Sequence, residues 1–90
     1  MSTLHILYSA ELPPALLRLW SEGDVLLLAG AGVTLALQPA TTLPAPCLAL
    51  ADAVQARGLT PRWPQDELPL LSPADWVALV ARHDKSLSWS

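Results

Sequence analysis

The sequence predicts an α/β fold: a small three-layer α/β/α domain in which helices cover both faces of a mainly parallel sheet. Residues 25–29, Val-Leu-Leu-Leu-Ala, form a strand-length run with no polar face, which is typical of a parallel strand buried on both sides. An amphipathic helical segment precedes this run, and a glycine turn into a further helix follows it. Helices and strands therefore alternate along the chain, as in layered α/β folds.

The first half of the chain supplies two strands and two helices. Residues 3–8 alternate weakly and form the expected first strand, and residues 24–29 form the second. Between them a helix is expected over residues 12–20, because its two prolines stand in the first turn, where the missing N–H is not needed. Its expected buried face consists of Leu12, Leu16, Leu19 and Trp20, opposite Arg18. Residues 33–37 are expected to form a short helix.

In the second half, residues 38–46 and 60–69 are rich in proline and are expected to be irregular. The third strand is expected at residues 47–50, and a short helix at residues 52–57 ends at Gly58. A fourth strand at residues 67–71 suits the edge of the sheet, because it contains a proline.

The last helix has the clearest start signal. Ser72 can cap it, Pro73 occupies the first position, and the carboxylate of Asp75 favours the helix dipole. The helix ends near residue 83, and residues 86–89 are expected to add a terminal strand. Its predicted buried face consists of Trp76, Val77, Leu79 and Val80.

The composition predicts one domain, residues 1–90, with more apolar material than it can bury. Of the 90 residues, 52% are apolar and 14% are charged, whereas an ordinary soluble domain has about 25% charged residues. A chain this short buries only roughly 60–65% of the surface that its unfolded form exposes. Some apolar side chains are therefore expected to face a partner protein.

Membrane and nucleic-acid partners are both disfavoured. The apolar run at residues 25–37 is shorter than the ~20 residues needed to span a bilayer, and no basic residue precedes Arg18, which argues against a secretory signal. We therefore expect a soluble, cytoplasmic protein. The net charge is −3 and the five basic residues are scattered, so no basic stripe for direct nucleic-acid binding is expected.

Cys47 is the only thiol in the chain, so neither an intrachain disulfide nor a cysteine-rich zinc site can form. A thiolate could carry a persulfide sulfur, but Cys47 begins an apolar strand and has no basic neighbour in sequence before Arg57. The favoured interpretation is a buried structural cysteine, which leaves no catalytic residue in the chain.

The other polar motifs predict no cofactor and no metal. Gly30 and Gly32 lack the third glycine of a dinucleotide fingerprint, because position 35 is leucine, so a plain strand-to-helix turn is favoured over a small-ligand site. His5 and His83 lack further ligands nearby. His5 is expected to be a hydrogen-bonded strand residue, and His83 a cation at a helix C-terminus.

Two of the four tryptophans are candidate subunit-interface residues. Trp63 lies between prolines and Trp89 lies in the terminal strand, where a small domain has little to cover them. Aromatic residues are enriched in interface cores. The alternative is that both fold back onto their own domain.

Four stretches resemble the TusB/DsrH family, small subunits of bacterial sulfur-relay complexes. Residues 16–33, LLRLWSEGDVLLLAGAGV, carry the likeness most clearly, and residues 4–7, 48–59 and 73–89 agree with the family in order and spacing. Two departures are visible. Some DsrH members carry a cysteine in the first helix, which this chain lacks, and many TusB relatives carry an acid where this chain has Ala31.

The resemblance implies a DsrE/DsrF/DsrH-like fold and a non-catalytic subunit of a TusBCD-type sulfurtransferase complex. In that role the chain would join TusC-like and TusD-like subunits in a heterohexamer, with the relay cysteine on the TusD-like partner. TusA-like and TusE-like carriers would deliver and receive the persulfide sulfur, which ends as 2-thiouridine at the wobble position of tRNA. Two alternatives stay open: a stand-alone sulfur carrier that uses Cys47, and a DsrEFH-type subunit in sulfur oxidation.

Overall fold

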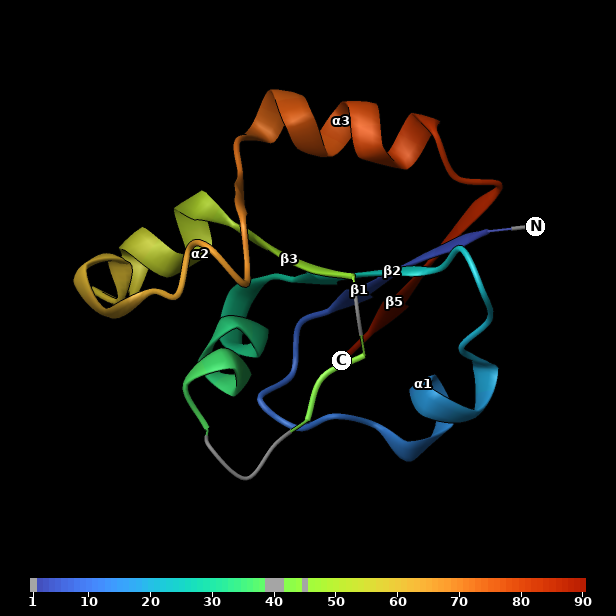
Figure 1. Cartoon of the computed structure of the whole chain (residues 1–90), viewed down its shortest axis with the longest axis horizontal. Helices are drawn as coiled ribbons and strands as arrows, with labels where there is room; N and C mark the ends of the chain where they lie inside the picture. Colours follow the sequence, from blue (N-terminus) through green and yellow to red (C-terminus); the bar gives the residue numbers. More distant parts are fainter. Residues whose placement is uncertain (1, 39–41, 45) are drawn as a thin grey trace.

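The computed structural model describes residues 2–38, 42–44 and 46–90, and its centre is a five-stranded, all-parallel sheet (Figure 1). The strand order is β4-β3-β2-β1-β5, so β1 lies next to both β2 and β5. The strands are β1 (Thr3–Leu7), β2 (Val25–Leu28), β3 (Cys47–Leu50), β4 (Leu70–Leu71) and β5 (Lys85–Trp89). The predicted α/β class with a parallel sheet is confirmed.

Helices lie on both faces of this sheet, which gives the three predicted layers. On one side of the sheet lie α1 (Pro14–Leu19), the 3₁₀ helix η1 (Gly30–Leu37), α2 (Ala51–Ala56) and the short 3₁₀ helix η2 (Thr60–Arg62). On the other side lies α3 (Pro73–Ala81) (Figure 1). The division follows from right-handed crossovers, because the chain steps from β1 to β4 in one direction and then returns past β1 to β5.

Strand β2 sits at the centre because its sequence has no polar face. Leu26 and Leu28 pack into the larger core under α1, η1 and α2, whereas Leu27 faces the smaller core under α3. All three are fully buried. The alternation of one strand between two cores explains why this segment is apolar throughout.

The edge strand β4 is shorter than predicted. It comprises Leu70 and Leu71 alone, directly after Pro69. The carbonyl of Pro69 still accepts a hydrogen bond from the backbone N–H of Ala49 at 3.1 Å. A proline at the entrance to an edge strand costs no ladder hydrogen bond, in agreement with the predicted edge position.

The start of α3 agrees with its sequence signal, but its predicted buried face is partly wrong. The hydroxyl of Ser72 accepts a hydrogen bond from the backbone N–H of Asp75 at 3.2 Å. Leu79 is buried, whereas Val77 is 69% exposed and Val80 is 38% exposed. The helix turns Leu79 toward the sheet, and that orientation points Val77 away from it.

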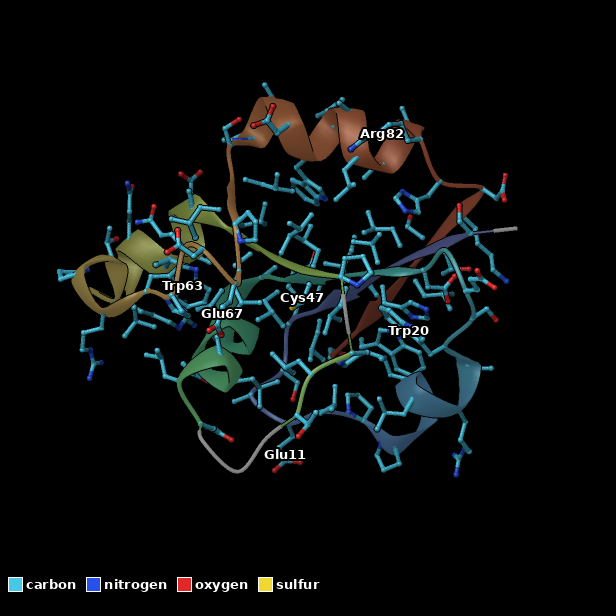
Figure 2. All side chains as sticks on the ribbon, viewed as in Figure 1. Glu11, Trp20, Cys47, Trp63, Glu67 and Arg82 are labelled. Carbon is cyan, nitrogen blue, oxygen red and sulfur yellow. The ribbon has the colours of Figure 1, made fainter. Side chains whose placement is uncertain are left out.

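A similar correction applies to α1. Leu16 is buried in the core, and Leu12 and Trp20 pack partly against it, but Leu19 is 56% exposed. The helix ends at Leu19, so the chain leaves the helical path before Trp20 and turns that indole toward the sheet (Figure 2). No helix in the part of the chain that the structure describes is long and apolar enough to cross a membrane.

Candidate functional site

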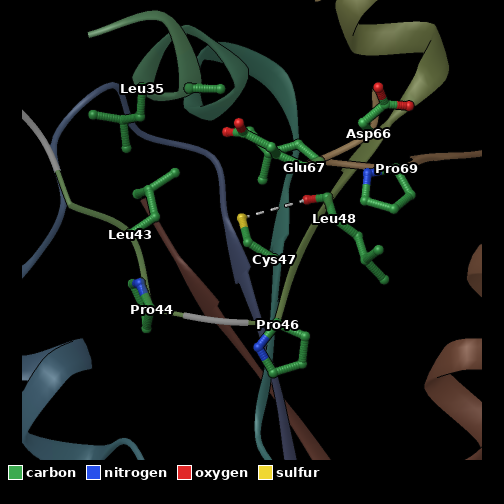
Figure 3. A pocket seen from close by; sticks show the side chains of 11 residues that line it. Leu35, Leu43, Pro44, Pro46, Cys47, Leu48, Asp66, Glu67 and Pro69 are labelled. Carbon is green, nitrogen blue, oxygen red and sulfur yellow. Dashed lines mark hydrogen bonds between the residues drawn. The ribbon is translucent and has the colours of Figure 1, made fainter. Parts of the chain in front are cut away.

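A cavity opens at the amino-terminal end of β3, where Cys47 begins the strand. Its volume is about 450 Å³, and it lies between η1, the segment before β3 and the segment before β4 (Figure 3). Leucine and proline side chains form most of its wall. The lining residues are Leu35, Ala36, Leu43, Pro44, Pro46, Cys47, Leu48, Asp66, Glu67, Leu68 and Pro69.

The thiol of Cys47 is the only sulfur nucleophile available to this cavity. Cys47 is 7% exposed, and its Sγ makes a weak contact of 3.9 Å with the carbonyl oxygen of Leu48. Burial raises the pKa of the Cys47 thiol to about 12. The group therefore remains a protonated thiol at neutral pH, whereas attack on a persulfide needs a thiolate.

The charges around the cavity do not favour a thiolate either. Asp66 and Glu67 contribute carboxylates to the wall, and none of its described lining residues is basic. Figure 3 labels Glu67 and Cys47 on the wall of the same cavity. Reactive cysteines are activated by electropositive surroundings, and the described lining of this cavity supplies none.

The glycine turn after β2, at Gly30 and Gly32, allows its backbone to pack closely against the end of β1. A Cβ atom at Gly32 would lie 2.2 Å from the carbonyl oxygen of Leu7, and Gly30 has a φ of +52°. Glycine at these two positions lets η1 begin directly against the end of β1. This packing accounts for both glycines without a bound ligand.

A buried polar cluster lies on the same face of the sheet, around His5 of β1. The Nε2 atom of His5 is 2.9 Å from Oδ2 of Asp24, and both side chains are buried. The indole of Trp20 stacks on the His5 ring with 5.1 Å between centroids. The indole N–H of Trp89 donates a hydrogen bond to Nδ1 of His5 at 3.1 Å. The prediction that His5, in the first strand, is a hydrogen-bonded structural residue is confirmed.

These contacts assign the proton of the imidazole. Because Nδ1 accepts from the Trp89 indole, the neutral ring carries its hydrogen on Nε2 and donates it to Asp24. Both ring nitrogens are thus engaged in hydrogen bonds within the chain. The cluster is built to join β1, β5 and the segment before β2.

Asp24 is the acceptor that this cluster depends on. Its carboxylate also accepts the backbone N–H groups of Thr3 at 2.9 Å and Ser21 at 3.0 Å. Burial alone would raise the pKa of this carboxyl, but the hydrogen bonds from His5, Ser21 and Thr3 outweigh it and lower the pKa below its usual value. Asp24 is therefore ionised at neutral pH.

The two predicted interface tryptophans already have partners inside the chain. Trp63, labelled in Figure 2, is 6% exposed. Its indole N–H donates a hydrogen bond to the carbonyl of Leu68 at 2.8 Å. Trp89 is half-buried and bonded to His5. Little surface of Trp63 remains for another subunit to cover, whereas part of Trp89 is accessible. An interface role for either residue stays a prediction.

His83 lies where the sequence places it, at the carboxyl end of α3. Its Nδ1 atom donates to the carbonyl oxygen of Leu79 at 2.8 Å, and this oxygen in the last turn of α3 also accepts the backbone N–H of Arg82 at 3.2 Å. Within residues 2–38, 42–44 and 46–90, no three or more His, Cys, Asp or Glu side chains are grouped so that they could hold a metal ion.

Comparison with known proteins identifies the family to which this chain belongs. Residues 9–86 match the model of a family described as "DsrH like protein", so the chain belongs to the DsrH-like family. The similar curated relatives are named "Protein TusB". Those from Escherichia coli O1:K1 and Escherichia fergusonii are each 41% identical over 81 residues, covering 83% of this chain and 84% of the relative. The protein from Escherichia coli O139:H28 is 40% identical over the same extent.

Sequence reasoning singled out His5 and Trp89, but it gave Asp24 no role and did not bring the three residues together. His5 and Trp89 lie near opposite ends of the sequence and meet because β5 pairs with β1. Asp24 reaches His5 because it immediately precedes β2, the other neighbour of β1. The signal that was present is Asp24 itself, a carboxylate placed immediately before a fully apolar strand. A buried charge of this kind requires hydrogen-bonding partners, and His5, expected to be a hydrogen-bonded strand residue, is a side chain that can supply one.

Proposed function

We propose that this chain is a non-catalytic, accessory subunit of a TusBCD-type sulfurtransferase complex in the cytoplasm. In this proposal residues 1–90 act as one DsrH-like domain, joined to TusC-like and TusD-like subunits in a heterohexamer. Persulfide sulfur passes from a TusA-like carrier to a cysteine of the TusD-like subunit and on to a TusE-like carrier. Its destination is 2-thiolation of the wobble uridine of tRNA, with no direct contact between this chain and the nucleic acid. Membership of the DsrH-like family supports the proposal.

The state of Cys47 is the observation that carries the accessory role. A relay cysteine exchanges sulfur as a thiolate, and it must reach the persulfide of another protein. Cys47 is buried, its pKa is raised to about 12, and the charged groups lining its cavity are carboxylates. A subunit whose only thiol is held in this way needs a cysteine from a partner to move sulfur.

Exposed apolar side chains support the hetero-oligomeric part of the proposal. Leu17 of α1 is 49% exposed, and Leu19 and Val77 are exposed further still. These side chains lie on opposite sides of the sheet, on α1 and on α3. Apolar side chains that remain exposed on a small domain suit surfaces that other subunits cover.

A stand-alone sulfur carrier is the second candidate, favoured by the fact that Cys47 lines a cavity rather than solid core. That function would require the side chains around Cys47 to move so that another protein could reach its thiol. It would also require an approaching cation to lower the pKa of the thiol. A DsrEFH-type subunit in sulfur oxidation is the third candidate, and it shares the fold and the family of the first.

Co-expression with TusC-like and TusD-like proteins from the same source tests the proposal. We expect one particle that contains all three chains in equal amounts, with the mass of two copies of each, measured by light scattering after size exclusion. Omission of one chain at a time supplies the controls and shows which neighbour this chain contacts. Failure of this chain to enter a complex formed by the other two would contradict the proposal.

A further inference from the structure

Helix α3 is the only helix on its side of the sheet in the part of the chain that the structure describes (Figure 1). Its inner face packs on the smaller core through Leu79 and Trp76. No element of the described chain covers its outer face, so that face meets either solvent or another molecule.

The outer face of α3 carries an apolar stripe whose residues are spaced as in the contact face of a packed helix. The stripe consists of Ala74, Val77, Ala78 and Ala81, all exposed, at positions i, i+3, i+4 and i+7. This spacing places all four on one side of a helix. Three of the four are alanine, so a second helix can approach to an interaxial distance of about 8 Å.

Two opposite charges lie on the same flank of this stripe. Asp75 and Arg82 are seven residues apart, which is almost two full turns, so both project from one side of α3. Within the described residues neither the Asp75 carboxylate nor the Arg82 guanidinium forms an ion pair. Figure 2 shows Arg82 at the carboxyl end of the helix.

We propose that the outer face of α3 is a self-association surface, on which α3 of a second copy of this chain packs antiparallel. A two-fold axis midway between Val77 and Ala78 places Ala74 opposite Ala81 of the second copy, and Val77 opposite its Ala78. In an antiparallel pair of this symmetry, like flanks of the two helices face each other. Asp75 of each copy then meets Arg82 of the other, which makes two ion pairs from charges that are unpaired within one copy.

A second copy fits this face because the pattern is self-complementary. The same four-residue stripe and the same two charges supply both halves of the contact, with the acid near the start of the helix and the base just beyond its end. The contact between two nine-residue helices is smaller than the ~800 Å² per partner of a standard interface, so weak association is expected for the isolated chain. The inference concerns α3 alone and does not rest on the proposed function.

Charge reversal tests the pairing. Sedimentation equilibrium of the wild-type chain over a concentration series should give a monomer–dimer equilibrium. Asp75→Arg and Arg82→Asp each leave like charges facing each other, so each should weaken the dimer at least about fivefold. The double variant restores opposite charges and should return the dissociation constant to within about twofold of wild type. Circular dichroism must show that each variant is folded, because both changes oppose the helix dipole.

Cross-linking tests the geometry without changing a charge. Ala78→Cys places a thiol close to the proposed two-fold axis, and mild oxidation should convert it to a disulfide-linked dimer. Ala56→Cys on α2 is the matched control, exposed but remote from α3, and should remain monomeric. A monomer at every concentration, or equal cross-linking of both variants, would overturn the proposal. So would protection of the introduced thiol on α3 by a different subunit, which would assign this face to that subunit.

Discussion

At the scale of single residues, the structure depends most on the carboxylate of Asp24. It is buried, and it accepts hydrogen bonds from His5, Thr3 and Ser21. Through His5 it is also linked to Trp89, the last residue of β5. One ionised side chain therefore joins the start of β1, the turn before β2 and the edge strand β5.

We predict that Asp24→Asn lowers the free energy of unfolding by about 3 kcal/mol at pH 7, because an amide cannot accept all three hydrogen bonds. The pKa of Asp24 is lowered in the folded protein, so its contribution to stability is fully present above the pKa of the unfolded chain and is lost as pH falls through the folded value. The difference between wild type and variant should therefore be largest near neutral pH and should narrow below about pH 4.

Urea unfolding at several pH values measures this difference. Asp66→Asn is the matched control, because Asp66 is exposed and lies outside the cluster. Its unfolding free energy should stay within about 0.5 kcal/mol of wild type. A constant deficit for Asp24→Asn from pH 7 down to about pH 3 would show that the ionised carboxylate is not the stabilising species.

At the scale of the elements, the contact between the end of β1 and the start of η1 leaves no room for an added side chain. Gly32 lies against the carbonyl of Leu7, where a Cβ atom would be 2.2 Å from the oxygen. Gly32→Ala should therefore destabilise the fold by at least about 3 kcal/mol, because backbone atoms of a central strand cannot move aside.

Gly58→Ala is the matched control for that substitution. Gly58 has a φ of +65° at the end of α2, but nothing lies within 4 Å of its added Cβ atom. Gly58→Ala should lower the free energy of unfolding only by the cost of placing alanine in the left-handed conformation, about 1–2 kcal/mol. Thermal unfolding of the two variants separates the effects, and equal losses of stability would contradict the steric account of Gly32.

The sequence predicted elements well where local chemistry decides them. The apolar run of β2, the Ser72 cap of α3 and the proline before β4 each specify their structure through neighbouring residues. The orientation of short helices was harder to predict. Val77 and Val80 were expected inside and lie outside, because apolar residues occupy both the inner and the outer face of α3.

At the scale of the whole molecule, the order of the strands could not be predicted from local sequence patterns. The pairing of β1 with β5 brings residues 5 and 89 together, and no local pattern encodes that contact. The cavity beside Cys47 has the same origin, since η1, β3 and the segment before β4 meet there only in the folded chain. Burial of Cys47 was predictable from its apolar strand, whereas its acidic surroundings at Asp66 and Glu67 were not.

The architecture also separates two surfaces by which the chain could enter an assembly. The exposed leucines of α1 lie on one side of the sheet, and the outer stripe of α3 lies on the other. A subunit that uses both can contact a different chain and a second copy of itself at once. This arrangement is consistent with an accessory role in which surfaces, rather than a reactive group, determine function.

The most direct test of that role is persulfide transfer through the reconstituted three-chain complex. Transfer of radioactive sulfur from a loaded TusA-like carrier to a TusE-like acceptor would be compared among wild type, Cys47→Ala in this chain, and alanine at the relay cysteine of the TusD-like chain. We predict that Cys47→Ala retains the wild-type rate to within about twofold, while the TusD-like variant abolishes transfer. Loss of transfer with Cys47→Ala in an intact complex would contradict the account and make Cys47 a relay residue.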